Sequence, residues 1–205
     1  MYPDRRTKIF VSPWVVLLLA SFVLLSSPLV LSAVLLAALV HELGHYALLR
    51  CLGGEIECVR ISPFGADMRI RNRERLSYVG EMLAVAAGPT VNILSAFLVA
   101  AAGKWADVAY VFAGAQLVLG LFNLLPVLPL DGGTLVWLLA AWLADPFVAD
   151  RVCRKIGLIT LLLLLLGGCF LLQHESGSPF LLIGAAGIVG SCLPQLGLVN
   201  KRKRR

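Results

Sequence analysis

Two histidines and a glutamate lie inside an apolar run, in the stretch LVHELGHYALLR at residues 39–50. His41 and His45 are four residues apart, so on a helix they share one face and lie one turn apart. Glu42 completes the H-E-x-x-H pattern, in which two imidazoles bind zinc and the glutamate acts as a general base. Ionisable groups in an apolar segment are costly unless a partner or a metal compensates them. The stretch therefore predicts a zinc hydrolase site.

A third zinc ligand must come from elsewhere, because catalytic zinc takes three protein ligands and keeps one position for water. Most other acidic residues fall in predicted loops, and His174 falls in a short loop predicted on the opposite side. Asp131 is the best candidate, because in FNLLPVLPLDGG two prolines interrupt the helix and two glycines allow close backbone approach. The five cysteines are widely spaced without a C-x-x-C pair, so they predict neither a zinc cluster nor a disulfide framework.

The composition predicts a membrane protein, since 59% of the 205 residues are hydrophobic and only 15% are charged. Soluble domains carry about a quarter charged residues. Apolar stretches of sufficient length predict an all-α polytopic fold with about six transmembrane helices, at residues 9–25, 29–49, 82–102, 108–128, 156–172 and 180–198. The first is expected to be a retained span, because no cleavage site follows it. Residues 132–144 are apolar but shorter and predict an interfacial or re-entrant helix.

The basic residues indicate the orientation of these helices. The net charge is +6, and in the six-span topology every lysine and arginine except Lys104 lies in segments on one side. The positive-inside rule then predicts that both termini are cytosolic, in a cell membrane, and it explains the charge without a nucleic-acid partner. His41 lies roughly 13 Å along the helix from Arg50, which places it in the cytosolic half of the bilayer. The span at 108–128 would deliver Asp131 to the same half.

Four motifs together give the sequence a resemblance to the site-2 protease family of intramembrane zinc metalloproteases, peptidase family M50. Within it, the chain is most similar to the sporulation factor IVFB-type branch. The motifs are HELGH at His41 to His45, PFG at Pro63 to Gly65, AAGPTVN at Ala86 to Asn92 and NLLPVLPLDGG at Asn123 to Gly133.

The resemblance implies one zinc ion per chain, held by His41, His45 and Asp131, with Glu42 activating water. It also implies that Asn123 contacts the substrate backbone or the developing oxyanion, although hydrogen bonding between helices is an alternative role for this residue. The expected activity is cleavage of membrane-associated or transmembrane regulatory proteins near the cytosolic face. A membrane-associated transcription-factor precursor would be one such substrate, and an inhibitory membrane partner is left open.

Residues 55–70, EIECVRISPFGADMRI, alternate like a strand with a Pro-Phe-Gly break. In the family such a segment forms a β-like edge near the active site, which would hold an extended substrate by strand addition. A basic loop that touches anionic lipid is the alternative.

The chain is expected to be a single membrane-embedded domain over residues 1–205, with a catalytic core at about 28–133 and without CBS or PDZ domains. Two other functions are weighed. A catalytically silent scaffold of the same fold is disfavoured because Glu42 and all three ligands are present. A metal or solute transporter should show polar residues along several spans and an inverted repeat, and neither is visible in the sequence.

Overall fold

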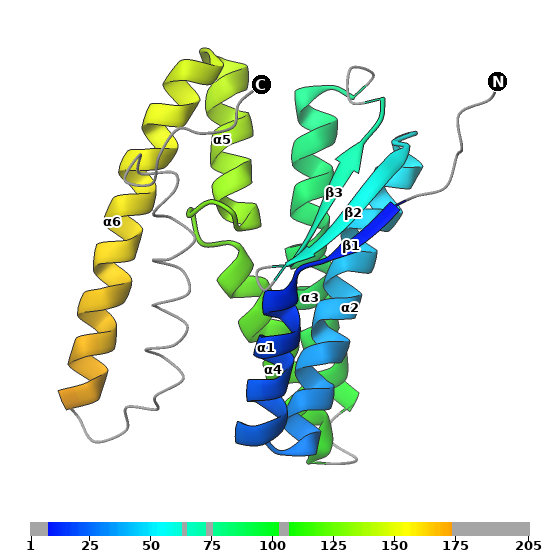
Figure 1. The fold of residues 1–205 in the computed structure, drawn as a ribbon, viewed down its shortest axis with the longest axis vertical. Helices are drawn as coiled ribbons and strands as arrows, with labels where there is room; N and C mark the ends of the chain where they lie inside the picture. The colour runs from blue at the N-terminus through cyan, green and yellow to red at the C-terminus, as the bar shows by residue number, and fades with distance from the viewer. Residues whose placement is uncertain (1–7, 63–64, 73–75, 103–106, 174–205) are drawn as a thin grey trace. The chain divides into compact units, whose positions relative to one another are not determined.

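The computed structural model of the chain describes residues 8–62, 65–72, 76–102 and 107–173. The chain divides into two compact units, one ending at Asn123 and the other beginning at Leu124. Within the described residues, the first unit contains four helices and a small sheet, and the second contains two helices (Figure 1).

The helices of the first unit are α1 (Pro13–Leu25), α2 (Pro28–Cys51), α3 (Tyr78–Ala102) and α4 (Val108–Asn123). α2 begins where the Ser27 hydroxyl accepts a hydrogen bond from the backbone N–H of Val30, at 3.3 Å. Pro28 follows at the first helical position, where the missing N–H costs no hydrogen bond. α2, α3 and α4 contact one another, so these three helices form one bundle.

Small side chains fill the interior of this bundle, and large apolar side chains point outward. The buried positions of α2 and α3 include Ala33, Ala37, Ala84 and Ala96, each at most 7% exposed. The outward positions of the same helices include Leu39, Leu43, Phe97 and Leu98, each at least 52% exposed. This distribution is typical of membrane bundles, where small residues let helices approach and large ones face lipid. α2 and α3 are long and apolar enough to cross a membrane, and α4 and α5 are apolar but shorter.

The sheet contains β1 (Lys8–Val11), β2 (Ile56–Ser62) and β3 (Gly65–Ile70), in the order β1-β2-β3. β1 runs parallel to β2, and β3 runs antiparallel to it. Asn72 closes the base of the hairpin, because its side chain donates to the Gly53 carbonyl at 2.9 Å and accepts from the Glu55 N–H at 2.8 Å. β3 is therefore an edge strand on a hairpin that is anchored to the end of α2.

The second unit begins with a loop at residues 124–130, followed by α5 (Asp131–Leu143) and α6 (Pro146–Gln173), which pack together. Asp145 caps α6, since its carboxylate accepts from the N–H groups of Phe147 and Val148 at 2.7 and 2.9 Å. Val127 in the loop packs against Leu161 and Leu164 of α6. The loop that carries the proline-rich motif is thus part of the core of this unit.

The structure confirms the predominantly helical fold and the β-like hairpin at residues 55–70, and corrects some boundaries. The expectation of helix from residue 9 is wrong at its start, because residues 8–11 pair with β2 and the helix begins only at Pro13. The predicted span at 108–128 ends at Asn123, since Pro126 and Pro129 cannot continue a helix. α5 agrees with the short helix predicted at 132–144. The predicted span at 180–198 and His174 lie outside the described residues.

Candidate metal centre

His41 and His45 meet on one face of α2, as their spacing predicts. Their Nε2 atoms are 3.1 Å apart, and their rings stand nearly perpendicular, at 85°. His41 is 5% exposed and lies on the buried stripe of α2 with Ala33, Ala37 and Gly44. The two ring nitrogens therefore point to a common location at the inner face of the helix.

The tautomer of His45 follows from its contact with α3. His45 Nδ1 lies 2.9 Å from the carbonyl oxygen of Ala84. A carbonyl oxygen only accepts, so Nδ1 carries the proton and Nε2 keeps its lone pair. Metal-binding histidines commonly have their second ring nitrogen held in this way, which fixes the orientation of the ring.

The geometry of the two imidazoles fits a zinc ion. Two nitrogens bound to tetrahedral zinc at about 2.05 Å would lie about 3.3 Å apart, and the observed separation is 3.1 Å. The pair can therefore supply two of the ligands that a zinc ion requires with little rearrangement.

Glu42 lies next to the start of β3. The side chain is half-buried, and a Cβ built on Gly65 would lie 3.3 Å from Glu42 Oε1. Gly65 has a positive φ of 124°, a backbone conformation that glycine adopts readily. The carboxylate of the candidate general base thus lies beside the first residue of β3.

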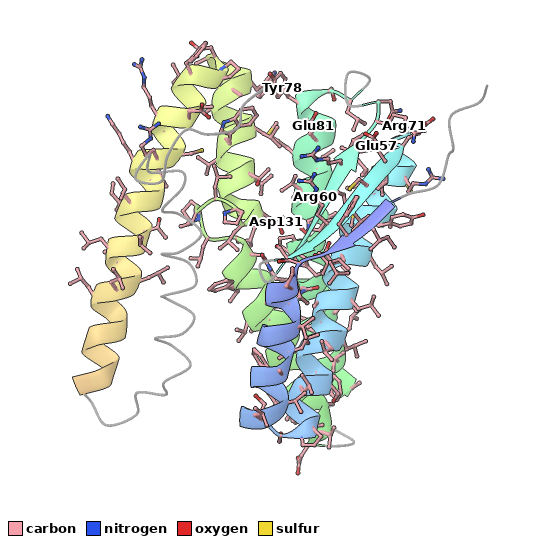
Figure 2. The ribbon with its side chains drawn as sticks, viewed as in Figure 1. Glu57, Arg60, Arg71, Tyr78, Glu81 and Asp131 are labelled. Atoms are coloured by element: carbon pink, nitrogen blue, oxygen red, sulfur yellow. The ribbon has the colours of Figure 1, made fainter. Side chains whose placement is uncertain are left out.

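Asp131 is the first residue of α5 and is labelled in Figure 2. A carboxylate is favoured in the first turn of a helix, where the backbone dipole is positive. Gly132 and Gly133 pack directly on the preceding loop, since a Cβ on Gly132 would clash with the Leu124 carbonyl and one on Gly133 with the Leu128 nitrogen. The D-G-G motif therefore begins the helix against the proline-rich loop.

Asn123 is the last residue of α4 and is 8% exposed. Its amide donates to the Leu119 carbonyl one turn earlier, at 3.1 Å. This hydrogen bond lies within α4. It is therefore not an example of the hydrogen bonding between helices that was the alternative role for Asn123.

Some residues around the site were missed by sequence reasoning. Gln116 of α4, which is 4% exposed, was not singled out, whereas Asn92 of α3 belongs to the AAGPTVN motif and is completely buried. Among the described residues, neither amide atom of Asn92 has a hydrogen-bond partner. The contacts of Ala84 and Gly88 with His45 were missed as well. One sequence signal was available, because the buried positions Gly80, Ala84, Gly88, Asn92 and Ala96 recur every four residues along α3.

Comparisons with known proteins show what the chain is similar to. The model of peptidase family M50 matches residues 99–167. Stage IV sporulation protein FB of Bacillus subtilis is 33% identical over 176 residues, which are 82% of this chain and 59% of that protein. A zinc metalloprotease of Methanocaldococcus jannaschii is 26% identical over 137 residues, 62% of this chain and 40% of that protein. The chain thus spans only part of the length of these relatives.

A solved structure shows the same fold. The site-2 protease from Methanocaldococcus jannaschii matches with a TM-score of 0.68 at 20% sequence identity, over 100% of this chain and 98% of that chain. The family model and the sporulation relative point to peptidase family M50, and the solved structure shows that the chain shares its fold.

Proposed function

We propose that the chain is an intramembrane zinc metalloendopeptidase that cleaves membrane-associated or transmembrane regulatory proteins near the cytosolic face. The observation that carries this proposal is the His41–His45 pair, with Nε2 atoms 3.1 Å apart beside Glu42 on a helix of membrane-spanning length. The named functions of the relatives, zinc metalloprotease and site-2 protease, support the same reaction class.

One zinc ion per chain would be held by His41, His45 and Asp131. Two imidazoles and one carboxylate are a common ligand set for catalytic zinc, and they leave one position for water. The sequence supports Asp131 as the third ligand, because its motif lies at the same predicted membrane depth as the histidines. When bound, zinc polarises the scissile carbonyl and lowers the pKa of a water molecule toward neutrality.

Glu42 would act as the general base and then as the general acid. Its carboxylate accepts the proton of the attacking water and returns it to the leaving amine of the cleaved peptide bond. The half-buried position beside Gly65 supports this role, since it partly shields the carboxylate from bulk solvent. Asn123 would contribute a contact to the substrate backbone or the oxyanion, and its amide has a second N–H beyond the one donated to Leu119.

The hairpin would hold the substrate as an added strand. A peptide bond inside a helix is inaccessible, so the substrate must unwind, and its freed backbone groups then need partners. β3 is an edge strand that begins beside Glu42, and an extended chain along this edge could form main-chain hydrogen bonds there. The alternative role, contact with anionic lipid, is supported by the arginines on the hairpin and just after it, of which Figure 2 labels Arg60 and Arg71.

The proposed topology places both termini in the cytosol and treats residues 1–205 as one membrane-embedded protease unit. The distribution of basic residues supports it. The partners would be a membrane-tethered protein substrate, the lipid bilayer and, in a regulated system, an inhibitory membrane protein.

The direct test is metal analysis of the full chain purified in detergent, combined with hydrolysis of fluorescently labelled casein. We expect one zinc per chain and hydrolysis that stops when a chelator removes the metal and resumes when zinc is restored. A chain that binds zinc without hydrolysis would indicate the silent scaffold. Zinc uptake into proteoliposomes that persists with Glu42→Gln would indicate a transporter.

A further inference from the structure

The helices α2 and α3 cross closely next to His45. A Cβ built on Gly44 would lie 3.0 Å from the Ala87 carbonyl oxygen and 3.2 Å from the Gly88 Cα. Both helices therefore present glycine at the crossing, and the backbone of α3 approaches the turn of α2 that carries the histidine pair.

The space next to Gly88 is filled by the imidazole of His45. A Cβ built on Gly88 would clash with His45 Nε2 and would lie 2.6 Å from Cε1 and 2.8 Å from Cδ2. These separations are shorter than real Cβ contacts, so the ring would have to move. Ala84 lies one turn earlier on α3 and accepts the Nδ1–H of the same ring at 2.9 Å. One face of α3 thus provides the hydrogen-bond acceptor for the ring at Ala84 and the space for the ring at Gly88, one turn later.

We propose that Gly88 is a positioning residue for His45. Because Gly88 has no side chain, the imidazole can take the one orientation in which Nδ1–H donates to Ala84 and Nε2 faces His41. Any larger residue would displace the ring from this orientation, breaking the Ala84 hydrogen bond, separating the two Nε2 atoms, or both. Gly88 acts through His45 and touches no substrate. The zinc part of this inference rests on the proposed function, whereas the contact between Gly88 and the ring does not.

The competing explanation is that Gly88 only lets the helices pack. Two other glycines allow a comparison. On α4, a Cβ added at Gly114 would have no atom of the described residues within 4 Å, so Gly114→Ala changes helix propensity without a clash among them. On the same buried ridge of α3, a Cβ on Gly80 would meet only the Ser77 hydroxyl at 3.3 Å and Leu52 Cδ1 at 3.8 Å. Gly80→Ala is therefore the control for adding a methyl group to this ridge away from His45.

The first experiment measures zinc affinity of the purified full chain by competition with a chromophoric chelator. We expect Gly88→Ala to weaken zinc binding at least about tenfold, the size of effect seen when the partners that orient a metal ligand are lost. Gly80→Ala and Gly114→Ala should stay within about twofold of the native chain. Nitrogen NMR of labelled histidine should show loss of the Nδ1-protonated tautomer of His45 in Gly88→Ala only. Native affinity together with a native histidine spectrum in Gly88→Ala would overturn the proposal.

The second experiment is a double-mutant cycle on the thermal unfolding of metal-free protein, which needs no zinc site. Gly88→Ala should lower the unfolding temperature in the native background and have little effect in the His45→Ala background, where the ring is absent. If Gly88→Ala does not fold by itself, the same reasoning predicts that His45→Ala restores folding. If Gly88→Ala lowers the unfolding temperature equally in both backgrounds, Gly88 serves helix packing alone. Failure of the native chain to bind zinc would instead count against the proposed function and leave this cycle interpretable.

Discussion

Glu42 Oε1 lies 3.3 Å from the position that a Cβ of Gly65 would occupy, although Glu42 belongs to α2 and Gly65 to β3, with β2 between them along the chain. The start of β3 and the candidate general base thus lie next to each other. This relationship connects the substrate-holding role proposed for β3 with the chemistry proposed for α2.

Gly65→Ala is predicted to impair both stability and catalysis. At a φ of 124° a side chain is strained, which should cost about 1 kcal/mol or more of unfolding free energy, and the new methyl group would crowd Glu42. Gly53→Ala is the matched control, since Gly53 also has positive φ, at 79°, but has no atom within 4 Å of its Cβ position. We expect both variants to lose thermal stability and only Gly65→Ala to lose at least about tenfold in casein hydrolysis. Equal casein hydrolysis by Gly65→Ala and Gly53→Ala would show that the position of Gly65 beside Glu42 has no role in catalysis.

Glu42→Gln is predicted to retain zinc and lose proteolysis. Glutamine has nearly the same shape as glutamate but cannot accept the water proton, and loss of a general base costs about 10²- to 10⁴-fold in rate. Metal content and hydrolysis measured on the same preparation test this. Substantial activity in the variant would show that another group takes the proton.

Asp131→Asn is predicted to weaken zinc binding by at least about tenfold, because an amide oxygen is neutral and a poorer zinc ligand than a carboxylate. The helix should still form, since asparagine is tolerated at helix N-termini. Zinc titration followed by circular dichroism measures both properties on one sample. Native zinc affinity in this variant would exclude Asp131 from the ligand set.

Cys153 is predicted to react with alkylating agents only at higher pH than Cys51. Burial, and secondly the nearby Asp150 carboxylate, raise the pKa of the Cys153 thiol above its ordinary value. The thiol also donates weakly to the Gly133 carbonyl, at 3.8 Å. Less thiolate is therefore present at a given pH, and the exposed Cys51 should be modified first.

Mass spectrometry of the protein after pulses of iodoacetamide at pH 7 to 10 measures both sites. Asp150→Asn should move the Cys153 profile only part of the way back, because burial is the larger cause. The same shift makes the folded state favour the neutral thiol. The contribution of Cys153 to the free energy of unfolding is therefore complete below the ordinary thiol pKa and decreases as the pH rises above that value. Equal reactivity of the two cysteines at pH 7 would contradict the burial of Cys153.

Helices and the hairpin were largely predictable because their signals are local. Apolar stretches gave α2 and α3, and the alternation around Pro-Phe-Gly gave β2 and β3. β1 was not predictable, because Lys8 to Val11 reads as the start of an apolar span and becomes a strand only by pairing with residues about fifty positions later. The end of α4 was predicted too late because the proline-rich loop is itself apolar.

The sequence by itself determined that His41 and His45 share a helix face and that Glu42 lies between them, because the helical repeat brings residues i and i+4 together whatever surrounds them. Only the tertiary structure decided which atoms orient them. The Ala84 carbonyl is 39 residues from His45, and Gly88 and Gly65 come from other elements again. The contacts of Ala84 and Gly88 with His45 depend on where α2 and α3 cross, and the position of Gly65 beside Glu42 depends on where β3 begins. Packing across the whole bundle sets these distances.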